Sequence, residues 1–315
     1  MTSRFILKMP VAKKKEPIKL KPFVKWAGGK GRLVGQLDAN LPQFLYDVPE
    51  ICYIEPFVGG GAMLFHMLNK FPNISRVVIN DINEELISCY RIVKENPRDL
   101  ISLLKEMEVD FLLEKQEGRK VLFYAYREEY NEKRNILSET RRCALFIFLN
   151  RTCFNGLYRV NFNGEFNVPY GRYINPTICD EATILSACEA LNKVDVIIKA
   201  GDYKDILGDI KNPTNTFVYF DPPYRPLLGE KNFQAYSKGP FSDLQQEELK
   251  AFCDGLTELG VRWMQSNSDS KNKDGTSYFE DLYDNYIFQI IYAPRAINAF
   301  GEGRGKITES LIKNY

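Results

Sequence analysis

The sequence predicts an α/β fold of the Rossmann-like kind, with a mainly helical segment inserted into it. Apolar runs typical of buried strands end next to an acidic residue at residues 51–55, 77–81, 196–203 and 216–221. A glycine-rich turn and a helical pattern follow the first run, which is the arrangement of a βαβ unit. Between residue 83 and residue 192 the pattern changes to helices and polar loops, so we expect the insertion there.

The composition is that of an ordinary soluble globular protein, with 44% hydrophobic and 26% charged residues in a chain of 315. This length predicts one to three domains. No apolar run approaches the length of a membrane helix and the N-terminus lacks the pattern of a signal peptide, so we expect a cytoplasmic protein. Seven scattered cysteines without a CxxC pair, together with the single histidine His66, predict reduced thiols and no structural zinc.

A basic run near the N-terminus is the main local concentration of charge. Lys13, Lys14 and Lys15 are followed closely by Lys19 and Lys21. Such a run is usually a solvated, flexible tail, which is our prediction for residues 1–20, and less often it contacts nucleic acid. The net charge of +1 neither favours nor excludes a polyanionic partner, because a basic surface can be balanced by acids elsewhere.

The most informative stretch is TFVYFDPPY at residues 216–224. The apolar strand must end at Asp221, because neither following proline can donate the N–H that a central strand needs. A carboxylate, rigid prolyl carbonyls and the ring of Tyr224 then meet at the carboxyl end of a strand, where open α/β sheets bind ligands. Asp221 and a prolyl carbonyl could each accept one hydrogen of a planar exocyclic amine, with Tyr224 stacked on the base. The alternative is a rigid turn whose tyrosine serves packing alone.

A second candidate site follows the strand at residues 51–55. Gly59, Gly60 and Gly61 allow a ligand to approach the backbone closely, and the helix that starts there supplies unpaired N–H groups. Asp81 lies about twenty residues further on, the spacing at which an acid binds the ribose hydroxyls of an adenosine cofactor. The glycine spacing departs from the pyrophosphate-binding pattern of NAD sites, so S-adenosylmethionine is the predicted cofactor.

The motif FVKWAGGKG at residues 23–31 is ambiguous by itself. It places Lys25 and Lys30 beside Trp26 and a tight glycine turn, which a ligand could use. A glycine turn beside a packed tryptophan would look the same.

Within the inserted segment, residues 150–173 combine asparagines, glycines and aromatic residues with Arg151, Arg159 and Arg172. Arginine and asparagine side chains read base edges and bind phosphates, so this stretch is a candidate DNA interface. The alternative is a polar surface insertion with hairpin turns such as Asn163-Gly164. The helical patterns around it carry apolar faces, which indicate core packing.

The C-terminal third completes the predicted sheet. A helix begins after the cap Ser242, with Gln245 three residues on, and stops at Gly260. Residues 261–268 predict a fifth strand. Residues 286–298 and 306–315, separated by a glycine-rich stretch, predict an antiparallel pair that closes a mixed sheet.

Together these motifs resemble those of the Dam-type DNA adenine-N6 methyltransferases, the family that modifies adenine in GATC. FVKWAGGKG, EPFVGGGA, IND, NGLYRVNFNGEFNVPYGRY, AGDY, DPPY, WMQSNSD and the tail KITESLIKNY occur in the family's order, that of the alpha class. The resemblance runs from Pro22 to Tyr315. The chain departs from the family pattern in its N-terminal extension and in an insertion around residues 271–277.

The resemblance implies a Rossmann-like, S-adenosylmethionine-dependent catalytic domain at residues 21–83 and 193–315, and an inserted, mainly helical target-recognition domain at residues 84–192. It implies that Asp221, Pro222 and Tyr224 hold the target adenine. The residues implied to bind the cofactor are Trp26, Lys30, Glu55, Phe57, Gly59, Gly61, Asp81, Asp202, Tyr203 and Asp221. Those implied to face DNA are Asn155, Arg159, Asn161, Asn167, Pro169 and Arg172.

The implied reaction is methyl transfer from S-adenosylmethionine to N6 of an adenine turned out of duplex DNA, in GATC, with S-adenosylhomocysteine as product and no metal. Double-stranded DNA is the expected partner. A cognate restriction endonuclease is left open, because the sequence does not separate a solitary regulator from the protective half of a restriction system. The alternatives are methylation of cytosine N4, of RNA or of a protein amide, and a catalytically silent DNA-binding protein. Asp221 favours adenine, because cytosine-N4 enzymes more often carry serine before the prolines.

Overall fold

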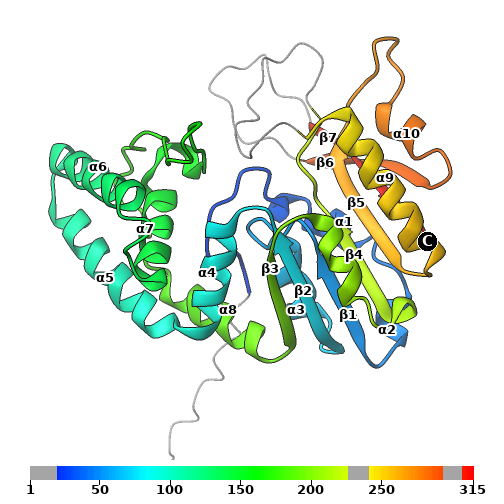
Figure 1. Cartoon of the computed structure of the whole chain (residues 1–315), viewed down its shortest axis with the longest axis horizontal. Helices are drawn as coiled ribbons and strands as arrows, with labels where there is room; N and C mark the ends of the chain where they lie inside the picture. The colour runs from blue at the N-terminus through cyan, green and yellow to red at the C-terminus, as the bar shows by residue number, and fades with distance from the viewer. Residues whose placement is uncertain (1–19, 226–240, 294–306) are drawn as a thin grey trace, which may run out of the picture.

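The computed structural model describes residues 20–225, 241–293 and 307–315, which form a mixed seven-stranded sheet in the order β3-β2-β1-β4-β5-β7-β6 (Figure 1). The strands are β1 Ile51–Glu55, β2 Ile74–Asp81, β3 Asp195–Ala200, β4 Thr216–Phe220, β5 Arg262–Ser268, β6 Ile287–Ala293 and β7 Ile307–Lys313. Strands β1 to β5 are parallel, and β7 runs antiparallel to both β5 and β6. The predicted Rossmann-like sheet with its antiparallel closing pair is confirmed.

The helices connected to this sheet differ greatly in length. The α-helices of the described residues are α1 Val34–Asp38, α2 Phe44–Asp47, α3 Ala62–Lys70, α4 Glu84–Glu95, α5 Pro97–Leu113, α6 Gln116–Glu132, α7 Glu139–Thr152, α8 Glu181–Asn192, α9 Asp243–Glu258 and α10 Tyr278–Leu282. Short 3-10 helices are η1 Lys30–Arg32, η2 Phe154–Gly156, η3 Tyr203–Asp209 and η4 Pro213–Asn215.

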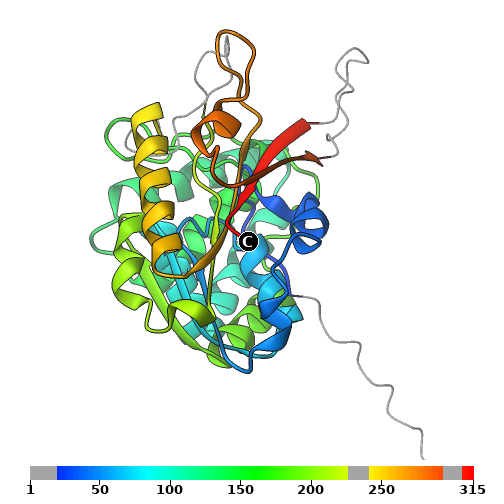
Figure 2. The same cartoon turned by 90° about the vertical axis from the view of Figure 1, so that its right-hand side faces the viewer.

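Strand side chains alternate between two hydrophobic clusters, one on each face of the sheet. Tyr53 and Phe217 belong to the cluster that includes α3, α4 and α8, whereas Ile54 and Val218 belong to the cluster that includes α9 and α10. Because successive strand residues point to opposite faces, a strand that is apolar throughout, such as β4, needs cover on both. Figure 2 views the β6 and β7 edge and shows α9 on one side of it and α1 on the other.

The inserted helices divide into two groups. Helices α4 and α8 pack against β3, whereas α5, α6 and α7 extend away from the sheet (Figure 1). Helix α7 packs against α4, α5 and α6 at once. This position explains its sequence, since residues 143–150 are all buried and apolar nearly all round.

Helix α9 begins and ends as its sequence predicts. The Ser242 side chain accepts from the backbone N–H of Gln245, and the Gln245 side chain accepts from that of Ser242. The helix ends at Glu258, and Gly260 follows with a φ of +81°. This left-handed residue turns the chain into β5.

The structure corrects the bounds of two predicted strands. β2 begins at Ile74, before the predicted start at residue 77, because Ile74 pairs with Ile51 of β1. β3 ends at Ala200 and does not continue to residue 203, because the Asp202 side chain accepts the N–H of Lys204 at 2.8 Å and caps η3. Residues 1–19 of the tail predicted at residues 1–20, and the predicted strand residues 294–298 and 306, lie outside the described residues.

The strand order reverses between β1 and β4. β2 and β3 lie on one side of β1, whereas β4 and β5 lie on the other. Ligands of open α/β sheets bind at the carboxyl ends of strands at such a reversal, because the connections that follow the two strands diverge there. Glu55 is the last residue of β1 and Asp221 directly follows β4, so both acids lie at this point.

Candidate active site

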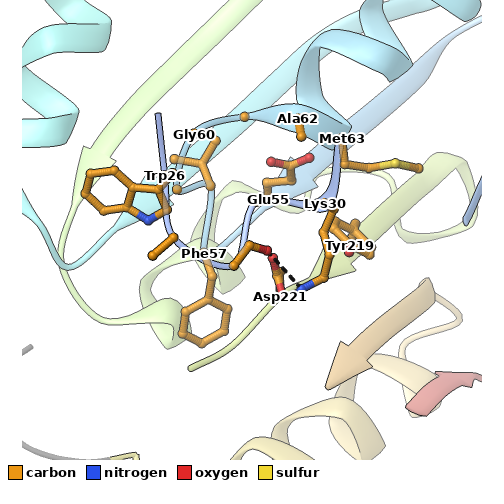
Figure 3. Close-up of a pocket in the computed structure, with 15 residues that line it drawn as sticks. Trp26, Lys30, Glu55, Phe57, Gly60, Ala62, Met63, Tyr219 and Asp221 are labelled. Atoms are coloured by element: carbon orange, nitrogen blue, oxygen red, sulfur yellow. Dashed lines mark hydrogen bonds and ion pairs between the residues drawn. The ribbon is translucent and has the colours of Figure 1, made fainter. Parts of the chain in front are cut away.

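A pocket lies at the carboxyl ends of β1 and β4, where the strand order reverses. Its lining comes from these two strand ends, from residues 26–30 and from the glycine turn with the start of α3 (Figure 3). Among the residues implied to bind the cofactor, those in the lining are Trp26, Lys30, Glu55, Phe57, Gly59, Gly61 and Asp221. Three segments that are distant in the sequence, residues 26–30, 55–63 and 219–221, therefore meet in one pocket.

The glycine turn depends on backbone conformations that other residues rarely adopt. Gly59 and Gly61 have φ values of +48° and +75°, in the left-handed region. A Cβ on Gly59 would lie 2.9 Å from Cδ1 of Trp26, so the indole lies directly against bare backbone. The N–H of Gly59 also donates to the Asp81 carboxylate at 3.0 Å, which joins the turn to the end of β2.

The other residues implied to bind the cofactor lie outside the pocket lining. Asp81 contacts Gly59 as described, and burial raises its pKa while the backbone N–H groups that it accepts lower it. Tyr203 packs on Phe57, with ring centroids 5.3 Å apart. Asp202 caps η3 with its side chain.

Lys30 is buried beside the carboxylate of Asp221. Its Nζ lies 2.6 Å from Asp221 Oδ1, and only 3% of the lysine side chain is exposed. The same ammonium contacts the hydroxyl of Tyr224 and lies 4.4 Å from the centroid of its ring. Burial raises the pKa of Asp221, although the charge of Lys30 opposes this rise. Lys30 therefore forms an ion pair with the carboxylate that is implied to bind the target amine.

Glu55 is a second acid that is almost completely buried in the pocket. Burial raises its pKa to about 8, although a hydrogen bond from the Tyr53 hydroxyl opposes the rise and the charge of Asp221 adds to it. The side chain is therefore mostly protonated at neutral pH. A cation that enters the pocket would favour the carboxylate.

Gln246 of α9 supports the turn that follows β4. It is fully buried, its Nε2 donates to the Pro223 carbonyl at 3.2 Å, and its Oε1 accepts from Asn267 of β5 at 3.3 Å. The turn is thus fixed against a helix and a neighbouring strand. At its end, the Tyr224 hydroxyl donates to Glu309 Oε2 at 2.6 Å.

Most residues implied to face DNA lie on a hairpin loop between α7 and α8. Arg159 donates from Nε to Asn167 Oδ1 at 2.6 Å, which orients its guanidinium. Asn161 Oδ1 accepts the backbone N–H groups of Asn163 and Glu165, each at 3.0 Å, and so forms the predicted hairpin turn. Asn161 therefore has a structural role in the loop.

The base of this loop carries the remaining residues implied to face DNA. Asn155 and Arg172 are exposed and both have a φ of 55°, a left-handed conformation that is uncommon outside glycine. Pro169 is exposed, and its carbonyl accepts the N–H of Phe154 at 2.8 Å.

The pocket and the hairpin loop are joined by direct contacts. The indole of Trp26 stacks on Tyr158, with centroids 5.8 Å apart and planes at 20°. Asn150, at 1% exposure, donates to the carbonyls of Lys25 and Gly156 at 2.7 Å and 3.0 Å and accepts the N–H of Lys25 at 2.8 Å. One side chain thus connects the segment before Trp26 with the loop before Arg159.

Comparison with known families decides the identity of the chain. The family model of the D12 class N6 adenine-specific DNA methyltransferases matches residues 26–296. The chain belongs to this family.

Curated relatives of this methyltransferase agree with the family. It is 42% identical to the type II methyltransferase M.MjaIII of Methanocaldococcus jannaschii, over 95% of this chain and 100% of that protein. It is 39% identical to the type II methyltransferase M1.LlaDCHI of Lactococcus lactis, over 96% and 98% of the two chains. Its identity to the DNA adenine methylase of Escherichia coli is 32%, over 93% and 95%. The resemblance to Dam-type enzymes and the adenine-specific activity on DNA are confirmed.

Sequence reasoning missed several side chains that hold the site of this methyltransferase together. They are Asn80, Asn150, Gln246 and Glu309. Asn80 donates to the carbonyls of Pro56 and Gly201, each at 3.0 Å, and so joins the loops after β1 and β3. For Asn80 and Asn150 the available signal was a polar residue directly after a strongly apolar run, which is a sign of a buried partner, whereas Gln246 and Glu309 lie among other polar residues and carry no such signal.

Among the residues that the structure describes, no group of three or more histidine, cysteine, aspartate or glutamate side chains could hold a metal ion. No helix there has both the length and the apolar composition needed to cross a membrane.

Proposed function

We propose that this methyltransferase transfers a methyl group from S-adenosylmethionine to N6 of an adenine turned out of duplex DNA, within GATC. The observation that carries the proposal is the position of Asp221. It follows β4, is paired with Lys30, and lines the same pocket as Glu55 and the glycine turn. The target GATC rests on the Dam-type motif at residues 150–173.

The residues around the pocket suit S-adenosylmethionine. When bound, this cofactor supplies an electrophilic methyl group on a sulfonium. Trp26 offers an aromatic face for an adenine ring, and Asp81 at the end of β2 has the position of a ribose-binding acid. Glu55 and Asp221 supply negative charge for the cationic sulfonium and amino groups.

Asp221 and the carbonyl of Pro222 prepare the adenine amine for attack. The N6 lone pair is delocalised into the ring, so N6 is a poor nucleophile. Two acceptors that bind both N6 hydrogens would localise the lone pair on nitrogen, so that N6 could displace S-adenosylhomocysteine from the methyl carbon as the carbon–sulfur bond breaks. The Asp221 carboxylate stabilises the positive charge that develops on N6 and accepts the proton that N6 loses.

The target base must leave the duplex because stacking hides its N6. The cost of unstacking, a few kcal/mol, is recovered by contacts in the enzyme, and Tyr224 supplies a stacking face. We assign target recognition to residues 84–192 and catalysis to residues 21–83 and 193–315. The residues assigned to DNA contact are Asn155, Arg159, Asn161, Asn167, Pro169 and Arg172.

The test uses plasmid DNA that lacks adenine methylation, labelled S-adenosylmethionine and digestion by GATC-specific endonucleases that differ in methylation sensitivity. We expect label on adenine and protection at GATC. Asp221→Asn, which keeps the side-chain size, lowers kcat at saturating cofactor about 100-fold or more. The matched control Asp195→Asn removes an exposed carboxylate of β3 and keeps full activity.

The outcomes separate the parts of the proposal. Label on adenine outside GATC contradicts the target sequence and leaves the chemistry intact. Absence of label from a protein that still binds the cofactor contradicts the reaction.

A further inference from the structure

Glu309 is a buried acid that the reaction described above does not use. It lies on β7, opposite Ser268 of β5 and Ile291 of β6, and is 8% exposed. Because β7 runs antiparallel to β5, the beginning of β7 lies at the carboxyl end of β5. The sheet topology therefore brings Glu309 to the edge where Asp221 follows β4.

Glu309 contacts two groups of the candidate active site. Its Oε2 accepts a hydrogen bond from the Tyr224 hydroxyl at 2.6 Å and lies 3.6 Å from Lys30 Nζ. Lys30 Nζ in turn lies 2.6 Å from Asp221 Oδ1 and contacts the Tyr224 hydroxyl. The ammonium is therefore located between two carboxylates, and Tyr224 donates to the second of them.

This arrangement matters because Asp221 has two tasks that compete. In the structure Asp221 is the nearer counter-ion of Lys30, whose side chain is only 3% exposed. To grip an adenine amine, the carboxylate must give up part of this pairing. A buried ammonium that lost its counter-ion would be strongly unfavourable, so a second carboxylate within reach is needed.

The charges around Glu309 agree with this second role. Burial raises the pKa of Glu309, and the charge of Lys30 opposes the rise most strongly. The hydrogen bond from Tyr224 also favours the carboxylate, whereas the charge of Asp221 disfavours it. Lys30 and Tyr224 thus both stabilise the ionised form of Glu309.

We propose that Glu309 is a positioning residue for methyl transfer, which orients the ring of Tyr224 and serves as second counter-ion of Lys30 while Asp221 binds the adenine amine. The inference rests on the proposed function of Asp221 and Tyr224. Its ionic part acts through Lys30, and its hydrogen-bonding part acts through Tyr224.

Two substitutions separate these parts. Glu309→Gln keeps an oxygen that can accept from Tyr224 and removes the charge, whereas Glu309→Ala removes both. We expect Glu309→Gln to lower kcat about tenfold and Glu309→Ala to lower it about a further tenfold, as expected for loss of a charge-assisted hydrogen bond. The KM values for cofactor and DNA should change far less than kcat, because neither ligand needs to touch Glu309.

A double-mutant cycle with Tyr224→Phe tests the hydrogen bond directly. The Phe variant keeps the ring and loses only the hydroxyl. If Glu309 acts through this hydroxyl, Tyr224→Phe slows a Glu309→Ala enzyme much less than it slows the wild type. The matched control is Ser310→Ala, on the same strand, whose buried hydroxyl donates to the Ser268 carbonyl at 3.3 Å. This control should keep the wild-type kcat.

The experiment measures kcat and both KM values by label incorporation into adenine, with thermal unfolding of each variant alongside. Wild-type protein that labels adenine, together with a folded Glu309→Gln variant of unchanged kcat, overturns this inference alone. Equal losses in Glu309→Gln and Ser310→Ala also overturn it, because they indicate a structural role. Wild-type protein that leaves adenine unlabelled overturns the proposed function and this inference with it. Because Glu309→Gln preserves size, it remains decisive if Glu309→Ala fails to fold.

Discussion

The candidate active site contains three acidic side chains that the fold buries near one another. Glu55, Asp221 and Glu309 all have raised pKa values, with burial as the largest cause. Asp221 and Glu309 share the ammonium of Lys30, at 2.6 Å and 3.6 Å. Glu55, whose pKa is raised to about 8, should lose its proton when a cation binds beside it, so ligand binding and proton binding are coupled at this residue.

Glu55 makes this coupling measurable. Because its pKa is about 8, binding of a cationic cofactor should release a proton. Cofactor affinity should therefore rise with pH, by up to about tenfold per pH unit below pH 8, and level off above it. Calorimetry in buffers of different ionisation enthalpy would detect the released proton. In Glu55→Gln this pH dependence should be lost, and a dependence that persists there would assign it to another group.

The same acid predicts the pH dependence of folding. The pKa of Glu55 is raised from 4.5 to about 8 by folding, so the folded state binds this proton more tightly than the unfolded state. The stability that this proton provides is complete below pH 4.5 and is lost as the pH rises toward 8. Glu55→Gln should therefore unfold at a higher temperature than the wild type at pH 8.5 and show a smaller difference at pH 6. An equal difference at both pH values would contradict the assignment.

The loops at the ends of secondary-structure elements determine where the side chains of the site point. The glycine turn after β1 places backbone against the indole of Trp26, and the hairpin loop after α7 orients Arg159 through Asn167. Both loops lie at the ends of rigid elements, which is where binding residues are commonly presented. Their function depends on local backbone geometry, so each can be tested by a substitution that changes this geometry or the side chain it presents.

Gly59 tests the glycine turn after β1, and Gly260, which follows α9, is its matched control. Both have positive φ, +48° and +81°, but a Cβ on Gly59 meets Trp26 at 2.9 Å, whereas one on Gly260 meets nothing within 4 Å. Gly59→Ala and Gly260→Ala should both lose about 1 kcal/mol of stability through backbone strain. Gly59→Ala alone should weaken cofactor binding, about tenfold or more, because it displaces the indole. Equal cofactor affinity in the two variants, measured by calorimetry, would show that the contact with Trp26 is unimportant.

Substitution of Arg159 would test whether the hairpin loop after α7 reads a base of the target. Removal of this side chain should cost about 1–3 kcal/mol of discrimination at one base pair of the target, the usual contribution of a base-reading arginine. Binding of duplexes that differ at single positions of GATC, followed by fluorescence anisotropy, would measure this in Arg159→Ala. Arg98→Ala, which removes an exposed arginine from α5, is the control for loss of charge. A uniform loss for all duplexes would indicate contact with phosphate and contradict base reading.

The whole molecule is organised so that the inserted segment contacts the pocket and does not stand apart from it. Helices α4 and α8 pack on β3, and the hairpin loop reaches the N-terminal segment through Asn150 and through the Trp26 and Tyr158 stack. Groups proposed to bind DNA and groups proposed to bind the cofactor therefore share one buried asparagine. A defect at this side chain should affect both ligands.

Substitutions of Asn150 and Asn131 would test the connection between the hairpin loop and the pocket. Asn131 of α6 exchanges hydrogen bonds with the backbone of Phe166, at 3.1 Å and 2.8 Å, and so supports the hairpin loop alone. Asn150→Ala leaves buried backbone groups of Lys25 and Gly156 unpaired, at about 1–3 kcal/mol for each group. It should weaken both cofactor and DNA binding, whereas Asn131→Ala should weaken only DNA binding. Unchanged cofactor affinity in Asn150→Ala would contradict the proposed connection.

Local patterns in the sequence were sufficient to predict most of the strands, helix ends and turns of the fold. The apolar run that stops at Asp221, the capping box at Ser242 and the glycine turn at residues 59–61 each depend on neighbouring residues only, so their structures were predictable. The same holds for the predicted pocket residues from Trp26 to Asp221, whose motifs end strands or form turns. The strand predicted at residues 196–203 ends earlier, at Ala200, because the Asp202 side chain caps η3, a local competition that strand periodicity does not reveal.

The tertiary structure alone decided which of these segments meet. Placement of β7 between β5 and β6 is a property of the sheet, and it is this order that carries Glu309 to Lys30 and Tyr224. The contact of Asn150 with Lys25 likewise joins residues far apart in the chain. The physical reason is that strand periodicity and turn chemistry act between neighbours, whereas burial and pairing of polar groups depend on segments that only the folded chain brings together.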